Sequence, residues 1–269
     1  MRAPRTRLRP LWLSLHEIVR RLVNARDLAV ACDFDGTLAP IAEHPAAVVL
    51  DERARAALES LVRAPRTQVA VLSGRSLPDL EARLGVAGIH LAGAAGLETR
   101  DLAGRRENHV PPGRGLPPDL APRLEGWCRG FRGAWVETKG PSLAVHYRAL
   151  APRREGEFVR GLRRMLRTWA GATRVTPGRK VFEVAPTVDH DKGAALEDWL
   201  RGLPGPLVFY FGDDAVDEPV HEAVRRRGGV SVAIGLRTSR AEFALPDPLQ
   251  VVWFLEWLAH EWQKVALPG

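Results

Sequence analysis

The chain has 269 residues, of which 45% are hydrophobic and 26% charged, a composition typical of a soluble globular protein. No apolar run approaches the roughly 20 residues that a membrane-spanning helix needs, so we expect no membrane span. The formal net charge is +7, but the basic residues are scattered and no nucleic-acid-binding motif accompanies them, so we expect no nucleic-acid partner. The two cysteines show neither metal-ligand spacing nor a disulfide framework, which fits a reducing, cytoplasmic compartment.

Residues 1–27 are expected to form a basic arm followed by a helix. Apolar residues recur there at helical spacing, at Trp12, Leu15, Val19 and Leu22. We favour a helix that packs on the core ahead of the first strand. Starts that are rich in arginine and poor in acids also occur in transit signals, so a targeting peptide stays open as the alternative.

The first predicted strand ends in two carboxylates. The apolar run over 28–32 is short and bounded, which predicts a buried strand of a parallel sheet. Because side chains alternate along a strand, Asp33 and Asp35 leave it on the same side. Two like charges this close repel unless a cation separates them, and Mg²⁺ is the hard, oxygen-binding cation that suits them. Gly36 permits the sharp turn that follows.

A second strand end carries groups that suit phosphate. We predict a helix over 51–62 and a strand over 67–72, which ends at Ser73-Gly74-Arg75. A hydroxyl and free backbone N–H groups at a strand-to-helix turn favour a bound phosphate. A helix over 77–84 and a strand over 89–92 follow.

An inserted unit begins after about residue 104, where the composition changes. Residues 110–122 are rich in proline and glycine, which indicates a linker. The order beyond it is helix, hairpin, helix, hairpin, which predicts a small open α/β sandwich that caps the site. Its predicted elements are helices over 120–131 and 155–169, and strands over 135–138, 143–148, 173–176 and 180–184.

The chain returns to the core with a lysine at a helix start. Asp191 is placed to cap a helix over 192–200. Lys192 then lies at the helix N-terminus, where a cation is disfavoured unless an anion is present, so a phosphate-facing role is favoured. His190 has no partner at ligand spacing, and we interpret it as a loop residue.

A second acidic pair follows the strongly apolar strand predicted over 207–211. A helix dipole explains acids in a first helical turn, but it does not explain Asp213 and Asp214 at a strand end. A strand over 229–234 and an apolar helix over 253–262 complete the predicted elements.

Together these anchors predict the fold class. They fall at the carboxyl ends of predicted strands or at a helix start, the edge at which open α/β sheets bind ligands. We therefore expect an α/β protein with a doubly wound, mostly parallel, Rossmann-like sheet. Its core domain is predicted over 28–104 and 188–269, and the inserted α/β cap domain over 105–187.

The hexapeptide from Asp33 to Leu38 resembles the first motif of the haloacid dehalogenase-like phosphohydrolases. The segments at Ser73, Lys192 and Asp213 resemble the second, third and fourth motifs. The resemblance implies that Asp33 is the nucleophile, Asp35 the general acid/base, Ser73 a phosphate ligand and Lys192 a neutralising cation. It also implies Mg²⁺ as the cofactor, held by Asp33, Asp35, Asp213 and Asp214, with Asp217 as the alternative to Asp214 for binding the waters of the ion.

Four further segments resemble the trehalose-phosphate phosphatase branch of that superfamily. They are residues 91–98 of the core, and 137–140, 146–148 and 178–186 of the cap. The resemblance implies that cap residues hydrogen-bond sugar hydroxyls, which need directional donors and acceptors. It assigns the substrate to Thr37, Gly74, Arg75, Glu98, Lys139, His146, Arg148, Arg179, Glu183 and Asp217.

The chain departs from that family pattern at four positions. Arg179 replaces a lysine conservatively, and the neighbouring Lys180 is an alternative for that role. Ala95 stands in place of a histidine, Ala185 in place of a basic residue and Val216 in place of a threonine. The first hypothesis is hydrolysis of trehalose 6-phosphate to trehalose and phosphate, with trehalose-phosphate synthase as a candidate partner. A phosphatase for another sugar phosphate, of the sucrose or glycosylglycerate type, stays open because of Ala95 and Ala185. A non-catalytic module that binds a sugar phosphate or the synthase is the third hypothesis, and the intact reactive residues argue against it.

Overall fold

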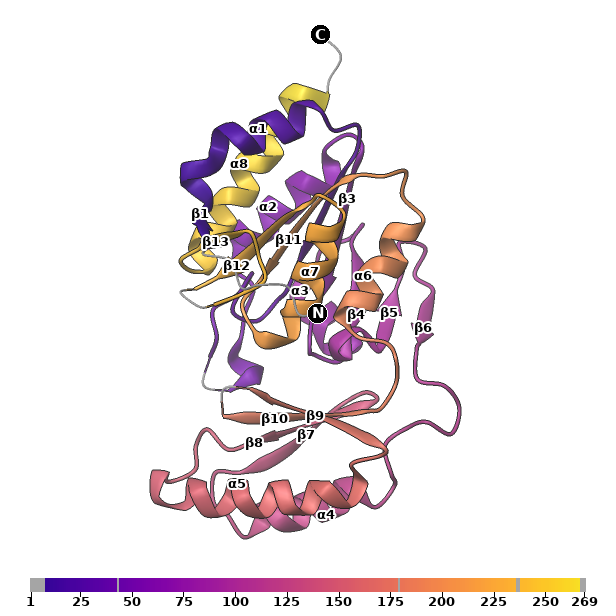
Figure 1. The fold of residues 1–269 in the computed structure, drawn as a ribbon, viewed down its shortest axis with the longest axis vertical. Coiled ribbons are helices and arrows are strands. Elements are labelled where there is room, and N and C mark those ends of the chain that lie inside the picture. The colour runs from indigo at the N-terminus through magenta and orange to yellow at the C-terminus, as the bar shows by residue number, and fades with distance from the viewer. Residues whose placement is uncertain (1–7, 43, 179, 236–237, 267–269) are drawn as a thin grey trace.

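The computed structural model describes residues 8–42, 44–178, 180–235 and 238–266. It has two parts, each built on its own sheet, as Figure 1 shows. The strands of the larger sheet are β1 (Arg9–Pro10), β2 (Leu28–Cys32), β3 (Thr67–Leu72), β4 (His90–Gly93), β5 (Glu98–Arg100), β6 (Arg106–Asn108), β11 (Leu207–Gly212), β12 (Val230–Ile234) and β13 (Phe243–Leu245). Those of the smaller sheet are β7 (Trp135–Lys139), β8 (Ser142–His146), β9 (Thr173–Gly178) and β10 (Val181–Pro186). The α-helices are α1 (Leu15–Val23), α2 (Glu52–Arg63), α3 (Leu77–Leu84), α4 (Leu120–Arg129), α5 (Pro152–Leu166), α6 (Lys192–Arg201), α7 (Glu218–Arg226) and α8 (Pro248–Ala266).

The larger sheet has the strand order β1-β13-β12-β11-β2-β3-β4-β5-β6. Neighbouring strands from β1 through β4 pair in parallel, whereas β5 and β6 add an antiparallel edge. The central strands β11, β2 and β3 therefore end side by side at one edge of the sheet. This edge receives the acid, hydroxyl and lysine segments that the sequence singles out.

Helices cover both faces of the larger sheet. Leu28, Val30 and Cys32 of β2 pack into the cluster that includes α1, α2, α3 and α8. Ala29 and Ala31, which point the other way, pack into the cluster that includes α6 and α7. Every residue of β2 is buried because both faces are covered, which explains its continuous apolar run. The predicted doubly wound, mostly parallel α/β core is confirmed.

The smaller part is an antiparallel sheet with two helices on one face. Its strand order is β7-β8-β10-β9. Apolar residues of the sheet, among them Val145 and Phe182, pack against Leu124 of α4 and against Phe158 and Leu162 of α5. The opposite face of the sheet is turned toward the larger part, as Figure 1 shows. This is the open α/β sandwich that the sequence predicts.

Four short strands at the sheet margins were absent from the sequence prediction: β1, β5, β6 and β13. Each is only two or three residues long, too short to show a period-two pattern, and β6 is exposed along its whole length. The larger sheet consequently reaches Asn108, four residues beyond the predicted limit of its first segment. In the described part of the chain, no helix combines the length and the apolar character that crossing a membrane requires.

Candidate active site

The loop after β2 folds back on itself and holds Asp33 at the sheet edge. The N–H groups of Leu38 and Ala39 donate to the Phe34 carbonyl, and the Gly36 N–H donates to the Ala39 carbonyl. Gly36 has φ +86°, and a Cβ there would lie 2.2 Å from Oδ2 of Asp213. Only glycine fits at this position, because the loop after β2 and the end of β11 approach each other so closely.

Lys192 joins two of the carboxylates. Its Nζ donates to Oδ1 of Asp33 at 2.5 Å and to Oδ1 of Asp217 at 2.8 Å. The Tyr210 hydroxyl also donates to Oδ1 of Asp217 at 2.6 Å, and the Asp214 N–H donates to Oδ2 at 2.9 Å. Lys192 and Asp217 are almost completely buried. The network therefore fixes the ammonium group beside Asp33.

The charges of this network determine how its members ionise. Burial lowers the pKa of Lys192, but the carboxylates of Asp217 and Asp33 outweigh burial and hold that pKa above its ordinary value. Burial raises the pKa of Asp33, with Lys192 opposing and the nearby charges of Asp217 and Asp213 reinforcing the increase. Burial also raises the pKa of Asp217, but Lys192 and Tyr210 outweigh it and lower that pKa overall. The lysine is thus a permanent cation at the base of the site.

Three carboxylates form a group that suits a divalent cation. One oxygen from each of Asp33, Asp213 and Asp217 lies within 4.8 Å of the others. These three acidic groups face one ammonium group, that of Lys192, and hard oxygen donors are what Mg²⁺ prefers. The residues present therefore fit a magnesium ion.

Two of the acids expected to hold the metal lie outside this group. Asp214 is exposed, and its side chain accepts from the Ala215 N–H at 2.6 Å, as the N-cap of the short 3₁₀ helix Ala215–Asp217. The Asp35 side chain is bound by an arginine instead. The group also includes Asp217, which was expected either at the substrate or beside the waters of the metal.

Arg75 binds the Asp35 carboxylate through two hydrogen bonds. Its Nε donates to Oδ2 at 2.7 Å, and one terminal nitrogen donates to Oδ1 at 2.6 Å. The same guanidinium donates to Asp79 at 2.6 Å and to the Pro45 carbonyl at 2.9 Å. Arg75 is only 5% exposed. Although we expected Arg75 at the substrate, its donors are directed at Asp35 and at the surrounding loop.

Two buried hydroxyls lie in the segments expected to meet phosphate. Ser73 is fully buried, and its Oγ accepts from the Arg75 N–H at 3.2 Å. Thr37 is also fully buried, and among the described residues its Oγ1 has no hydrogen-bond partner. A buried unpaired hydroxyl costs stability unless a ligand satisfies it, so Thr37 is placed to meet one. A Cβ at Gly74 would meet no atom within 4 Å, so the side of the turn that it would occupy is open.

The turn after β4 supports the start of α6. Gly96 has φ +99°, and a Cβ there would lie 2.5 Å from the backbone of Asp191 and 2.8 Å from the Lys192 nitrogen. Asp191 is the N-cap of α6, and its side chain accepts from the Ala194 N–H at 3.0 Å. Ala95, which stands in place of the family's histidine, has φ +57° in the same turn. This turn positions Lys192 by close backbone packing.

The cap face turned toward the core carries a row of polar side chains, here called the cap row. Its members are Glu137, Lys139, His146 and Glu183. Glu137 and Glu183 flank Ala144 in the sheet register. Lys139 Nζ donates to Oε1 of Glu183 at 2.9 Å, and a ring nitrogen of His146 bonds to Oε2 of Glu137 at 2.7 Å. The structure therefore brings together the cap residues Lys139, His146 and Glu183 that the sequence identified.

The sequence analysis missed Trp135 on this face. Its ring stacks on His146 with centroids 4.3 Å apart, and the two residues are opposite each other in the register. Trp135 is 37% exposed, which is unusual for so large an apolar side chain. The signal was an aromatic residue two positions before Glu137, on the same strand face.

Contacts between the two parts bring the cap row close to the core site. A Cβ at Gly140 would lie 2.7 Å from the Glu98 carboxylate, which itself accepts from the Leu77 N–H at 3.3 Å. Burial raises the pKa of Glu137, but the His146 hydrogen bond, Lys139 and the charge of Arg75 lower that pKa overall. The cap row thus faces the Asp35–Arg75 pair.

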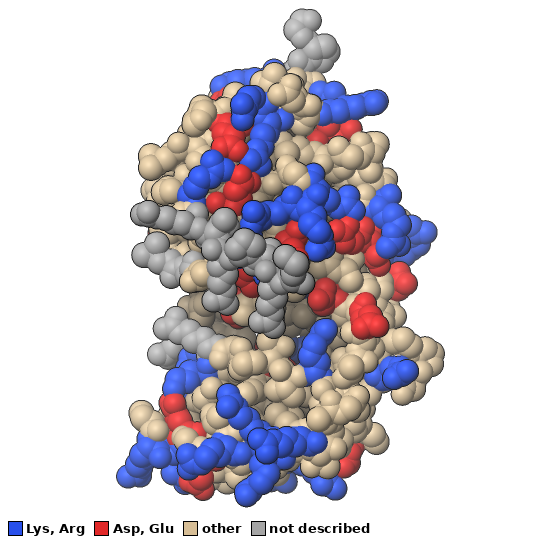
Figure 2. All heavy atoms as spheres, in the orientation of Figure 1, with Lys and Arg blue, Asp and Glu red and all other residues tan. Residues whose placement is uncertain are grey.

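Arg148 makes a second contact with the core, donating to the Ala42 carbonyl at 2.8 Å. Arg179, which we expected at the substrate, lies outside the described residues. Figure 2 shows the surface drawn in and hollowed between the two parts, with basic and acidic groups interspersed over both.

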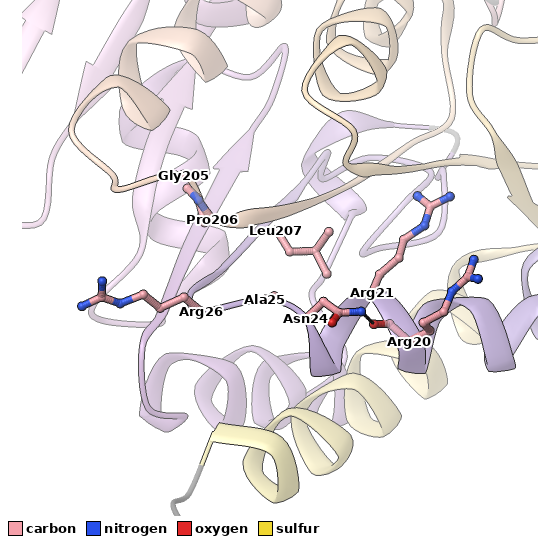
Figure 3. Close-up of a pocket in the computed structure, with 8 residues that line it drawn as sticks. All are labelled: Arg20, Arg21, Asn24, Ala25, Arg26, Gly205, Pro206 and Leu207. Carbon is pink, nitrogen blue, oxygen red and sulfur yellow. Dashed lines mark hydrogen bonds between the residues drawn. The ribbon is translucent and has the colours of Figure 1, made fainter.

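A separate hollow of about 460 Å³ lies between the end of α1 and the start of β11. Figure 3 shows Arg20, Arg21 and Arg26 around it. Arg21 is already paired with Glu242 at 2.8 Å. The hollow lies at the start of β11, whereas the acids lie at the carboxyl ends of the strands. We therefore place the candidate active site at the edge of the larger sheet that carries Asp33, Asp213 and Asp217.

A match to a family model identifies the family of the chain. A family model described as trehalose-phosphatase covers residues 31–248, which includes every acid, hydroxyl and lysine described above. The chain belongs to the trehalose-phosphatase family. This confirms the resemblance that the sequence motifs carry.

Curated relatives are similar to the chain over most of its length. The trehalose-phosphate phosphatase of Mycobacterium bovis is 38% identical over 255 residues, covering 90% of this chain and 64% of that protein. An uncharacterized glycosyl hydrolase of Mycobacterium tuberculosis is 37% identical over 270 residues, covering 95% of this chain and 20% of that protein. The chain therefore spans less than two thirds of the length of these curated relatives.

Solved structures of the trehalose-phosphatase family show the same fold. The C-terminal domain of a C. albicans trehalose-6-phosphate phosphatase matches with a TM-score of 0.84 at 21% identity, covering 96% of this chain and 99% of that chain. An Aspergillus fumigatus trehalose-6-phosphate phosphatase matches with a TM-score of 0.63 at 25% identity, covering 91% of this chain and 97% of that chain.

Proposed function

We propose that the chain hydrolyses trehalose 6-phosphate to trehalose and phosphate, with Asp33 as the nucleophile and Mg²⁺ as the cofactor. The observation that carries the proposal is the buried Lys192, which binds Asp33 at 2.5 Å and Asp217 at 2.8 Å beside a third carboxylate. A buried cation among three acids is costly to assemble for structure alone. It is the arrangement that a transferring phosphoryl group needs. Family membership supports the same reaction.

Asp33 and Asp213 are the residues proposed to hold Mg²⁺. Both belong to the group of three acids, and Gly36 lets the loop of one approach the other. Asp217 already accepts three hydrogen bonds, so its main role is to fix Lys192. When bound, Mg²⁺ supplies positive charge to the phosphoryl oxygens and to the attacking carboxylate.

In the proposed first step, an Asp33 oxygen attacks phosphorus and the bond from phosphorus to the sugar oxygen breaks. The sugar oxygen takes a proton from Asp35, so trehalose leaves as an alcohol. In the second step, Asp35 takes a proton from water, and the water oxygen displaces Asp33 from phosphorus. Asp33 then returns to its ionised starting state, and Asp35 to its protonated one. Lys192, Ser73 and Thr37 bind phosphoryl oxygens throughout.

Covalent, acid–base and electrostatic effects are all required. Uncatalysed hydrolysis of phosphate monoesters is so slow that enzymes provide accelerations up to about 10²¹-fold. General acid–base catalysis contributes about 10²- to 10⁴-fold on its own. The remainder must come from the covalent route, from substrate positioning and from the preorganised charges of Lys192 and the cation.

We further propose a division of labour between the two parts. The larger part carries out the phosphoryl chemistry, and the smaller part is a cap that recognises the sugar through Lys139, Glu183 and His146. The contacts of Gly140 with Glu98 and of Arg148 with Ala42 support a cap that closes on the core. Closure would exclude bulk water from the site.

A phosphatase for a different sugar phosphate is the second candidate. The departures at Ala95 and Ala185 favour it, because both positions replace polar residues of the family pattern. The deciding experiment measures kcat/KM for phosphate release from trehalose 6-phosphate, sucrose 6-phosphate, a glucosylglycerate phosphate and glucose 6-phosphate, with Mg²⁺ present. We expect trehalose 6-phosphate to be hydrolysed most efficiently. A higher kcat/KM for another ester would replace the substrate, and no phosphate release from any of them would overturn the enzyme assignment.

A further inference from the structure

Two histidines meet where the chain crosses between the larger part and the smaller part. His109 directly follows β6 on the segment that leaves the larger sheet, and His190 directly precedes Asp191 and α6 on the segment that returns. Both segments run on the same side of the molecule in Figure 1. The two imidazole rings lie 3.9 Å apart between centroids and are parallel to within 4°. This pair therefore connects the chain segment that leads into the smaller part with the segment that leads back out of it.

Carboxylates complete the cluster. A ring nitrogen of His190 lies 3.4 Å from Oδ2 of Asp198, which is on α6. Glu107 of β6 places Oε1 3.9 Å from Nδ1 of His109. One donor atom from each of His109, His190 and Asp198 lies within 4.8 Å of the others. Four possible ligands thus come from the two crossing segments and the elements next to them.

The nitrogen atoms of this cluster are only partly satisfied. Within the described residues, Nδ1 of His190 is buried and has no hydrogen-bond partner. Nε2 of His109 bonds to Oγ1 of Thr99 at 2.9 Å, which leaves Nδ1 directed toward Glu107. A metal-binding histidine commonly has its second nitrogen held in this way by a neighbouring group. His109 therefore has the arrangement of a preoriented ligand.

Two imidazoles and one or two carboxylates determine which kind of ion the cluster suits. Imidazole suits Zn²⁺ and similar transition metals, whereas Mg²⁺ prefers oxygen donors and water. Burial and the neighbouring His190 lower the pKa of His109. We propose that His109, His190 and Asp198, with Glu107 as a fourth donor, form a binding site for Zn²⁺ or a related divalent transition metal.

Binding at this site requires a small rearrangement. The lone pairs of two parallel rings do not converge, so the rings must tilt toward a common point to reach zinc–nitrogen distances of about 2.0–2.1 Å. The side chains of both histidines are more than four-fifths buried, and we expect rotation about the terminal ring torsions to supply this tilt. The bound ion would connect the two crossing segments and restrict movement of the cap relative to α6.

The test uses the full chain, stripped of metal and then kept in excess Mg²⁺ so that the acid site is occupied. Zn²⁺ binding is followed by titration calorimetry, and Co²⁺ is added as a spectroscopic probe. We expect one Zn²⁺ per chain and Co²⁺ absorption bands of a nitrogen- and oxygen-ligated centre. His109→Gln and His190→Gln should each weaken Zn²⁺ binding by at least about tenfold.

Controls separate this site from others. His260→Gln alters an exposed histidine of α8, and Asp213→Asn alters the acid site; both should retain Zn²⁺ binding. Asp198→Asn keeps both rings in place and should weaken binding as well, which guards against a histidine variant that fails to fold. Zn²⁺ binding that survives both histidine substitutions, or that disappears only in Asp213→Asn, would overturn the proposal, as would the absence of saturable binding in excess Mg²⁺. None of these outcomes depends on the phosphatase reaction.

Discussion

Arg75 and Asp35 form a two-point ion pair, with hydrogen bonds of 2.7 and 2.6 Å to the two carboxylate oxygens. Arg75 comes from the turn after β3, and Asp35 from the turn after β2. A planar guanidinium fixes both the position and the rotation of a carboxylate, which a single-point contact does not. The proposed proton donor is therefore oriented by a neighbouring strand end.

Arg75→Lys tests this orientation. Lysine keeps the charge but makes only a point contact, so Asp35 should lose its fixed orientation. We expect kcat/KM for trehalose 6-phosphate to fall about 10- to 100-fold, within the range of general acid–base contributions. The fall should be much smaller for p-nitrophenyl phosphate, whose leaving group departs without a proton. Arg83→Lys is the matched control, since Arg83 bonds to the same Asp79 but not to Asp35. Equal losses on both substrates would refute the orienting role.

Asp213 and Asp214 are adjacent in sequence, and the structure gives them different surroundings. Asp213→Asn should weaken Mg²⁺ binding at least about tenfold and abolish most turnover, because it removes a carboxylate from the three-acid group. Asp214→Asn should retain Mg²⁺ binding, since this exposed side chain caps a short helix. Titration calorimetry with Mg²⁺ on both variants checks the difference. Chelation of the wild-type protein should stop catalysis, and Mg²⁺ should restore it. The reverse order of effects would place the metal at Asp214.

Glu183→Gln tests the sugar role of the cap. The substitution preserves shape but removes the charge that accepts from Lys139 at 2.9 Å. Unpaired polar groups penalise only a substrate that carries the matching hydroxyls. We therefore expect a large fall in kcat/KM for trehalose 6-phosphate and little change for p-nitrophenyl phosphate. Glu155→Gln, which alters a cap glutamate paired with Lys180, is the control. Parallel losses on both substrates would make Glu183 structural.

His90 predicts a pH dependence of stability. Burial lowers its pKa from 6.5 to about 4 in the folded chain. The unfolded chain therefore takes up a proton between pH 6.5 and 4 that the folded chain does not, so the free energy of unfolding falls as pH decreases through that window. The loss from this group is about 3 kcal/mol at pH 4. Urea unfolding of wild type and His90→Gln at pH 7 and pH 4.5 measures it. A variant whose stability changes with pH as steeply as that of wild type would contradict the prediction.

Ala95 occupies a conformation that suits glycine better. Its φ of +57° lies in the left-handed region, which costs a non-glycine residue about 1–2 kcal/mol. Ala95→Gly removes that cost but gives the unfolded chain more freedom, so a net gain of about 0.5–1 kcal/mol is expected. Ala95→Val should act in the opposite direction, because a branched side chain fits this region worse. Urea unfolding of the pair provides the comparison, and a destabilised Ala95→Gly would show that the turn is not strained.

The sequence was most informative where a segment is bounded by its own residues. The strand over 28–32 and the helix over 77–84 have the predicted limits, because an apolar run between carboxylates and a helix between Ser76 and Gly85 are each bounded by their own residues. The short edge strands β5 and β6 have no such boundary, since their pairing depends on β4 and not on their own apolar pattern.

The site was predicted at the level of residues but not of partners. Asp33 and Lys192 lie together as expected, although 159 positions separate them. The partner of Arg75 depends on how the turns after β2 and β3 face each other, and the meeting of His109 with His190 depends on the crossing of two linkers. Spacing along the chain cannot show either contact. The catalytic and binding roles of these residues stay predictions.

Both segments that cross between the two parts run along one side of the molecule, and the loop that contains Ala42 lies on the other side in Figure 1. A body attached along one side can rotate about its attachments, but it cannot move away as a whole. Any such rotation displaces the unattached side most. The hydrogen bond from Arg148 to the Ala42 carbonyl, 2.8 Å long, spans that side. We therefore expect this contact to separate first if the cap opens, which would let the proposed sugar phosphate enter past Ala42.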